Sequence, residues 1–163
     1  MNEQEMKVIR LGTIHTSTSQ WKIELKPEFR GALVALEGFS HVQVLFWLHL
    51  HDTMELRKTV TCNKPYKKAP DVVGIFATRS DYRPNPVGLS VCPVKNIDIE
   101  KGIVELYYID AEDGSPVIDI KPYHPGVDRV KHVSTPPWCA HWPQWYEDLG
   151  DFNWADEFNF PLS

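Results

Sequence analysis

The chain has 163 residues, of which 42% are hydrophobic and 24% charged, so it has the composition of one ordinary soluble domain and not of a disordered or fibrous protein. No run approaches the ~20 apolar residues of a membrane span, and residues 1–5 lack the basic and then apolar pattern of a secretion signal. We therefore expect a cytoplasmic protein that does not contact membranes.

The charge is unevenly distributed along the chain. Overall, 17 basic and 22 acidic residues give a formal net charge of -5. Residues 57–83 nevertheless carry seven basic and two acidic residues, whereas residues 145–163 carry five acidic and no basic ones. Because charges beyond ~8 Å are screened at physiological salt, the basic segment could hold phosphates on an acidic protein. The alternative for residues 64–68 is a solvated lysine-rich loop.

Cysteine and histidine spacing argues against a metal site. Cys62, Cys92 and Cys139 lie far apart with no C-x-x-C pair, which favours reduced thiols. His49 and His51 could reach one metal ion, but no third ligand is fixed near them, so we expect no bound metal.

Strand signals dominate the chain. Residues 41–51 are almost continuously apolar and predict a strand buried on both faces, at the centre of the sheet. Two short segments, 143–149 and 154–158, are the only helix candidates. Short strands separated by Gly, Pro and Asp predict a mostly β protein, as a barrel or a highly curved antiparallel sheet. The expected strands are residues 8–14, 31–36 (a strand or a helical turn), 41–51, 72–77, 88–94, 103–109 and 116–120.

A proline-containing loop, residues 74–90, is the first candidate binding element. Two prolines flank Asn85 and hold the residues before them extended, so polar side chains there are positioned with little freedom. Arg79 and Arg83 supply guanidiniums suited to a carboxylate or phosphate, and Asn85 offers both a donor and an acceptor. Two structural alternatives remain: Asn85 closing an Asx turn, and Arg83 pairing with Asp81.

A second candidate element is residues 110–123. Asp119 and Lys121 lie two apart on an apolar strand and therefore point to the same face. Inside a small barrel such a pair would be partly desolvated, so it would either bind a ligand or pair internally.

Four separated groups of residues carry a family resemblance. They are Gly38-Phe39-Ser40-His41 before a strand ending in Phe46-Trp47-Leu48-His49, Ala77-Thr78-Arg79-Ser80 with Pro86-Val87-Gly88-Leu89-Ser90, Asp113-Gly114-Ser115-Pro116, and Asp119-Ile120-Lys121-Pro122-Tyr123. With these motifs the chain resembles the TsaA-like, or TrmO, family of S-adenosylmethionine-dependent methyltransferases over residues 11–128. The resemblance implies a single small β-barrel that forms a homodimer, binds the cofactor near the subunit boundary and is not a Rossmann fold. No G-x-G-x-x-G run is present, which agrees.

The resemblance also implies the cofactor-binding residues and the reaction. By motif these residues are His49, Leu50, Arg79, Leu89, Tyr108, Ile109, Asp110 and Ala111, and the proline loop adds Arg83 and Asn85 as candidates. The implied reaction is methylation of the exocyclic amine of threonylcarbamoyladenosine in tRNA. Asp119, Asp110 and His49 are open candidates for the proton acceptor, and no catalytic residue is assigned.

The chain departs from the family pattern in two places. Residues 16–21 lack the Pro-Arg-Gln stretch that contacts the cofactor in family members, and the C-terminal domain of longer members is replaced by an aromatic, acidic tail. Two alternatives therefore stay open: a methyltransferase for a smaller acceptor, and a protein that binds S-adenosylmethionine without turnover. We expect residues 1–137 to form the barrel domain. The tail, residues 138–163, could stack on bases, but its five carboxylates repel phosphate, so we expect it to pack over the barrel or across a dimer.

Overall fold

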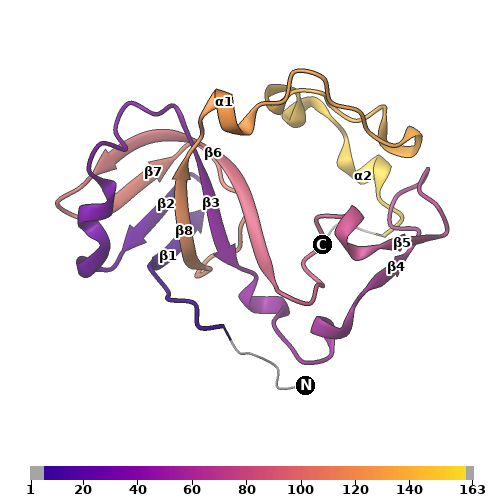
Figure 1. Ribbon diagram of the computed structural model, residues 1–163, viewed down its shortest axis with the longest axis horizontal. Helices are drawn as coiled ribbons and strands as arrows, with labels where there is room; N and C mark the ends of the chain where they lie inside the picture. The colour runs from indigo at the N-terminus through magenta and orange to yellow at the C-terminus, as the bar shows by residue number, and fades with distance from the viewer. Residues whose placement is uncertain (1–5, 161–163) are drawn as a thin grey trace. The chain divides into compact units, whose positions relative to one another are not determined.

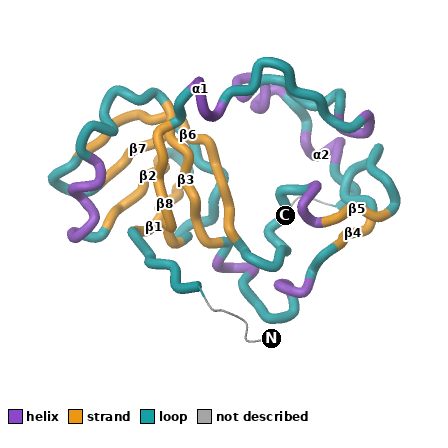
Figure 2. The backbone as a smooth tube through the Cα atoms, in the orientation of Figure 1, coloured by secondary structure: helices purple, strands orange, loops and turns teal. Residues whose placement is uncertain are grey.

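The computed structural model describes residues 6–160, and these divide into two units (Figures 1 and 2). The barrel unit contains residues 6–53 and 85–129. The aromatic unit contains residues 54–84 and 130–160. The sequence predicts one boundary at residue 137, whereas in the structure the C-terminal segment packs with residues 54–84, which the chain inserts between two strands of the barrel.

Six antiparallel strands close the barrel in the order β1-β2-β7-β6-β3-β8. Figure 1 shows these strands wrapped around one another, and Figure 2 shows that the helices are short. The mostly β barrel is therefore confirmed, and the fold is not a Rossmann fold. The strand bounds are β1 Gly12–Ser17, β2 Gln20–Leu25, β3 His41–Trp47, β6 Val87–Asp98, β7 Ile103–Leu106 and β8 Pro116–Pro122.

The central strand β3 corrects one sequence prediction. Its burial alternates, with Val42, Val44 and Phe46 buried and their neighbours only half-buried, so the strand is not buried on both faces. It also ends at Trp47, and residues 49–51 form a 3-10 turn. Inward and outward residues alternate along a barrel strand, and the outward Leu45 and Trp47 are apolar and half-buried, so the apolar run did not show which side chains point inward.

The other elements are short. In the barrel unit they are η1 Pro27–Leu33, η2 His49–His51 and α1 Pro125–Asp128. For η1, the sequence predicts a strand or helical turn slightly later, at residues 31–36. The predicted helix at 154–158 is present as α2, and the one predicted at 143–149 is a 3-10 helix that begins three residues later. The elements of the aromatic unit are η3 Leu56–Lys58, β4 Thr61–Asn63, β5 Val72–Gly74, η4 Ile75–Ala77, η5 Pro137–Cys139, η6 Tyr146–Asp151 and α2 Trp154–Glu157.

The barrel core is aliphatic and tightly closed. Ile14, Ile23, Val44 and Val104 are fully buried, one from each of four strands. Gly88 lets the ring of Phe46 approach the backbone, because a Cβ at this position would lie 2.5 Å from two ring atoms. This packing holds the strand ends, and the loops that leave them, in fixed positions.

The aromatic unit has a different core. Tyr66 is buried at its centre and stacks on Trp138, with ring centroids 5.6 Å apart and an interplanar angle of 13°. Trp142 meets the same tyrosine edge-on at 4.7 Å, and Phe158 lies against it at 5.4 Å. The tail aromatics therefore pack on residues of the 54–84 segment. No helix among residues 6–160 is long and apolar enough to cross a membrane.

Candidate cofactor site

One end of the barrel collects residues from three separate parts of the chain. Strand β3 ends at Trp47, which pairs with Val87 at the start of β6, and Phe46 pairs with Val117 near the start of β8. Because the strands are antiparallel, the residues after β3, those opening β6 and those preceding β8 meet at the same end. We call this end the rim.

The segment from Tyr107 to Ser115 connects β7 to β8 along the rim, and it contacts β6 near its start and β1 near its end. The backbone N–H of Tyr107 donates to Pro93 at 2.9 Å, and that of Asp110 donates to Ser90 Oγ at 3.4 Å. At its far end, the N–H of Gly114 donates to the carbonyl of Ile14 at 2.9 Å. These contacts, with Ile109 buried in the core, hold the predicted Tyr108–Ala111 segment to the barrel.

His49 is held against the Asp113-Gly114-Ser115 turn. Its Nδ1 lies 3.3 Å from Ser115 Oγ, and the serine is only 1% exposed. Gly114 has a φ of +80°, which glycine adopts without strain, and a Cβ there would lie 3.9 Å from His49 Nε2. The turn and the histidine, 66 residues apart, thus form one polar contact.

Apolar and aromatic side chains are exposed around these polar groups. Leu50 is 58% exposed, Tyr108 48% and Leu89 42%. The edge of Trp21 meets Tyr108 with centroids 5.9 Å apart and an angle of 65°, which restrains the phenol. Among the predicted site residues, His49, Leu50, Leu89 and Tyr108–Ala111 therefore lie on the barrel unit, and so does Asn85, whose carbonyl accepts from Val87 N–H at 2.7 Å.

Two titratable groups, Tyr108 at the rim and Cys92 in the barrel core, stay protonated at neutral pH. Burial raises the pKa of Tyr108, and the nearby Asp110 and Cys92 raise it further. Burial likewise raises the pKa of the Cys92 thiol to about 11. The tyrosine hydroxyl is therefore available as a hydrogen-bond donor, and the buried thiol is not a nucleophile.

The two predicted arginines lie in the aromatic unit. One terminal nitrogen of Arg83 donates to the carbonyls of Thr78 at 3.0 Å and Ile75 at 3.4 Å, so this guanidinium holds its own loop. Thr78 reinforces the loop by donating from its hydroxyl to the carbonyl of Ile75 at 2.8 Å. Arg79 is exposed one residue further along.

The pair of Asp119 and Lys121 corrects another expectation. Lys121 Nζ lies 2.6 Å from Asp119 Oδ2, so the two side chains do pair with each other. Both side chains are exposed, however, so the pair lies on the outside of the barrel and is not desolvated. A register shift between Leu45 and Phe46, opposite residues 117–119 of β8, changes which side chains point inward.

Comparison with known families identifies the chain. Residues 8–129 match the family model described as the tRNA-methyltransferase O N-terminal domain. The chain belongs to this family. The matched residues cover the barrel unit and the inserted segment up to residue 84, and they end before the aromatic tail.

Several relatives of the TrmO family are similar to this chain. A protein of Methanothermobacter thermautotrophicus named "Probable S-adenosyl-L-methionine-binding protein" is 44% identical over 114 residues, 70% of this chain and 77% of that protein. The tRNA (adenine(37)-N6)-methyltransferase of Escherichia coli is 40% identical over 105 residues, 63% of this chain but 44% of the enzyme. The crystal structure of TrmO from Pseudomonas aeruginosa matches with a TM-score of 0.61 and 30% identity, over 80% of this chain and 62% of that one. The match thus spans less than two thirds of both the E. coli enzyme and the P. aeruginosa structure.

The structure also places the segment where this chain lacks the TrmO Pro-Arg-Gln stretch. Residues 16–21 form the hairpin between β1 and β2, and Thr16 N–H donates to Asp113 Oδ1 at 2.8 Å. Trp21, at the end of this hairpin, contacts Tyr108 as described above. The hairpin is thus attached to the rim through Thr16 and Trp21.

The sequence does not predict the contacts of three residues at the rim: Ser90, Ser115 and Trp21. Both serines stand within motifs of the TrmO family, but a motif does not say which side chain contacts which. No sequence pattern marks Trp21, because the residue that it contacts, Tyr108, is 87 positions away in the chain. Within residues 6–160, no three His, Cys, Asp or Glu side chains are arranged to hold a metal ion.

Proposed function

We propose that this chain is an S-adenosylmethionine-dependent methyltransferase that methylates the exocyclic amine of an adenosine in tRNA, with the cofactor held at the rim. The observation that carries the proposal is the convergence of His49, Leu89 and the Tyr108–Ala111 segment at one end of the barrel. The names of the E. coli and P. aeruginosa relatives support the reaction. The finer assignment to threonylcarbamoyladenosine is part of this proposal.

The chemistry of the rim suits S-adenosylmethionine. Leu50 and Leu89 offer exposed apolar surface to the adenine, and the Tyr108 hydroxyl is a donor at neutral pH. The exposed Asp110 carboxylate suits the ribose hydroxyls or the positive sulfonium. Arg79 lies in the other unit, and its role in binding the cofactor carboxylate through a charge-assisted hydrogen bond stays a prediction from the family motifs.

Catalysis in this proposal comes mainly from placement. Bound S-adenosylmethionine supplies an electrophilic methyl group. The adenosine amine is a weak nucleophile because its lone pair is delocalised into the purine, so the residues of the rim must hold the amine in line with the methyl group. Such positioning can contribute an effective molarity of ~10⁵ M or more. Three residues remain candidates to accept the departing proton. They are His49, which Ser115 orients, Asp110, and Asp119, which already pairs with Lys121.

Nucleoside analysis tests the proposal. Purified chain, S-adenosylmethionine carrying a labelled methyl group and unmodified or threonylcarbamoylated tRNA should yield labelled methyladenosine species by mass spectrometry. A deletion strain should lack the same nucleoside. Cofactor binding without any labelled nucleoside would instead favour a binding protein without turnover, and label in a small metabolite would favour a smaller acceptor.

We also propose that the chain is cytoplasmic and forms a homodimer. Large apolar side chains exposed on the described surface support a further interface; Phe76, for example, is 86% exposed. Light scattering at micromolar concentration should give about twice the 18.8 kDa of one chain. A monomeric mass would contradict both the dimer and a cofactor site shared across its boundary.

A further inference from the structure

The C-terminal tail fixes the shape of the basic loop at residues 64–68. Lys67 N–H donates to the carbonyl of Glu157 at 3.0 Å, and Asn159 N–H donates to the carbonyl of Pro65 at 3.0 Å. Asn159 Nδ2 also donates to the carbonyl of Lys64 at 2.8 Å. Tyr66 and Phe158 form a β-bridge between these segments. The tail therefore adds to the loop like a short strand.

This arrangement leaves two ammonium groups available. Lys64 lies 3.9 Å from Asp71, and Lys58 lies 3.3 Å from Glu55. Among residues 6–160, neither Lys67 nor Lys68 has a carboxylate within ion-pair distance. Glu157 is 6% exposed and is bound by His141 Nε2 at 2.9 Å, and Lys68 interacts with its charge from beyond ion-pair distance, so this carboxylate is not presented to an incoming anion.

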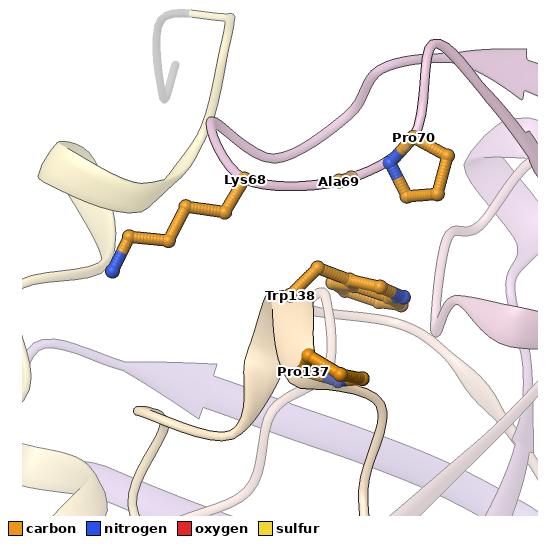
Figure 3. Close-up of a pocket in the computed structure, with 5 residues that line it drawn as sticks. All are labelled: Lys68, Ala69, Pro70, Pro137 and Trp138. Atoms are coloured by element: carbon orange, nitrogen blue, oxygen red, sulfur yellow. The ribbon is translucent and has the colours of Figure 1, made fainter.

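An apolar pocket opens beside Lys68. It has a volume of about 560 Å³ and is lined by Lys68, Ala69, Pro70, Pro137 and Trp138. Figure 3 shows Pro137 and Trp138, from η5, across the pocket from the backbone of residues 68–70. The stacking of Trp138 on the buried Tyr66 holds the indole in place. The pocket is wide open to solvent, so it offers a surface for a flat ligand and does not enclose one.

We propose that this pocket binds an unpaired nucleotide of the RNA substrate. The base lies against Trp138 and the two prolines, and Lys67 and Lys68 bind the neighbouring phosphates. A flat aromatic ring beside free ammonium groups is the combination by which proteins bind single-stranded nucleic acid without reading its sequence. Trp138 and Pro137 lie beyond residue 129, so the stacking side of the site is outside the family match, whereas the lysines lie within it. The inference rests on the proposed tRNA substrate.

RNA binding by matched variants tests the stacking contact. Fluorescence anisotropy with a labelled substrate tRNA should show that Trp138→Ala weakens binding by roughly 5- to 150-fold. Trp138→Phe keeps an aromatic surface and should stay near the wild type. Trp145→Ala is the control, because Trp145 is an exposed tryptophan of the same tail outside the pocket lining, and it should bind RNA as the wild type does.

The lysines are tested by salt dependence. Lys67→Gln with Lys68→Gln should reduce the slope of log affinity against log salt by about 1.4, because each phosphate contact to a single strand contributes about 0.7. Lys131→Gln, which removes one positive charge of the same unit outside the pocket lining, is the control and should change the slope by less than one contact. Affinity for S-adenosylmethionine should be unchanged in all these variants.

The outcomes separate this inference from the proposed function. If the wild type methylates tRNA while folded Trp138→Ala and the double lysine variant bind it with unchanged affinity and slope, the pocket is not an RNA site and the inference is overturned. If the wild type neither binds nor methylates tRNA, the proposed function fails as well. A thermal unfolding curve checks that each variant is folded. If Trp138→Ala unfolds, Trp138→Phe and the exposed lysine variants still test the site.

Discussion

The two units of this chain are stabilised in different ways. The barrel unit buries aliphatic side chains that alternate along strands of four to twelve residues, and its backbone is paired around a closed sheet. The aromatic unit has only two strands of three residues each, and its core is made of rings from segments about 70 to 90 residues apart together with a buried carboxylate. A closed sheet fixes loop ends through the backbone, whereas the aromatic unit depends on a few large side chains.

This difference bears on function. The rim is built from loops that leave paired strands, so its residues are fixed by the barrel. The basic loop of the aromatic unit is instead fixed by the tail, through Glu157, Phe158 and Asn159. We therefore expect substitutions at the rim to alter cofactor binding and substitutions in the basic loop to alter RNA binding.

The largest expected effect is on the barrel core. Phe46 is buried and packs directly on Gly88, so Phe46→Ala leaves a cavity that neighbouring backbone cannot fill. We expect the free energy of unfolding to fall by about 3–5 kcal/mol. Denaturant unfolding followed by circular dichroism measures this loss. Val34→Ala, at an exposed position, should change stability by less than about 0.5 kcal/mol. Equal effects of the two substitutions would contradict the core described here.

Substitution of Arg79 tests whether cofactor binding depends on the barrel unit alone. Arg79 belongs to the aromatic unit, and the family motifs predict that it binds the cofactor carboxylate. Arg79→Ala should weaken S-adenosylmethionine binding by roughly 10- to 150-fold, corresponding to about 1.5–3 kcal/mol for a charged hydrogen bond. Calorimetry measures it, with Arg57→Ala as a control in the same unit. Unchanged affinity would remove Arg79 from the site and leave the cofactor to the barrel unit alone.

Acid stability should distinguish the units. Burial alone would raise the pKa of Glu157, but the hydrogen bonds from His141 and Trp142, with the positive charges of His141 and Lys68, together outweigh it and hold the pKa below its ordinary value of 4.5. The ionised carboxylate therefore stabilises the aromatic unit above about pH 4.5, and this contribution is lost as the pH falls through the lower folded value. Glu157→Ala should cost about 1–3 kcal/mol at pH 7 and remove this acid dependence.

Hydrogen exchange measured at pH 7 and pH 4 can assign that effect to a unit. The acid-dependent opening should be confined to residues 54–84 and 130–160, while the barrel strands keep their protection. Opening of the barrel strands over the same range, or an acid response that persists in Glu157→Ala, would show that the buried pair does not control the aromatic unit.

The smallest effect is expected at the rim. Ser115→Ala removes the hydroxyl that contacts His49 Nδ1, and a hydrogen bond of this kind contributes about 0.5–1.5 kcal/mol. Cofactor affinity should fall by roughly 2- to 10-fold. Ser17→Ala, in the exposed β1–β2 turn, is the control. Equal affinity of the two variants would mean that Ser115 does not orient the histidine for binding.

The sequence predicts the barrel unit better than the aromatic unit, for a physical reason. Apolar runs separated by Gly, Pro and Asp are local signals, so the β class and most strands could be predicted, although β2 and β4 were missed and the alternation of Val42, Val44 and Phe46 was not recognised. Tyr66 and Trp138 lie 72 positions apart, and no local period connects them. The site residues were predicted through family motifs, whereas the contacts of Ser115 and Trp21 depend on how the loops meet after folding.

The most direct test of the account is hydrogen–deuterium exchange with and without S-adenosylhomocysteine, the demethylated product of the cofactor. With the cofactor at the rim, exchange should slow in residues 47–50, 87–90 and 107–115, which form the rim, with little change in β4, α2 and the loop at residues 64–68. Protection confined to the aromatic unit, or no protection at the rim despite binding measured by calorimetry, would contradict the placement of the cofactor on the barrel.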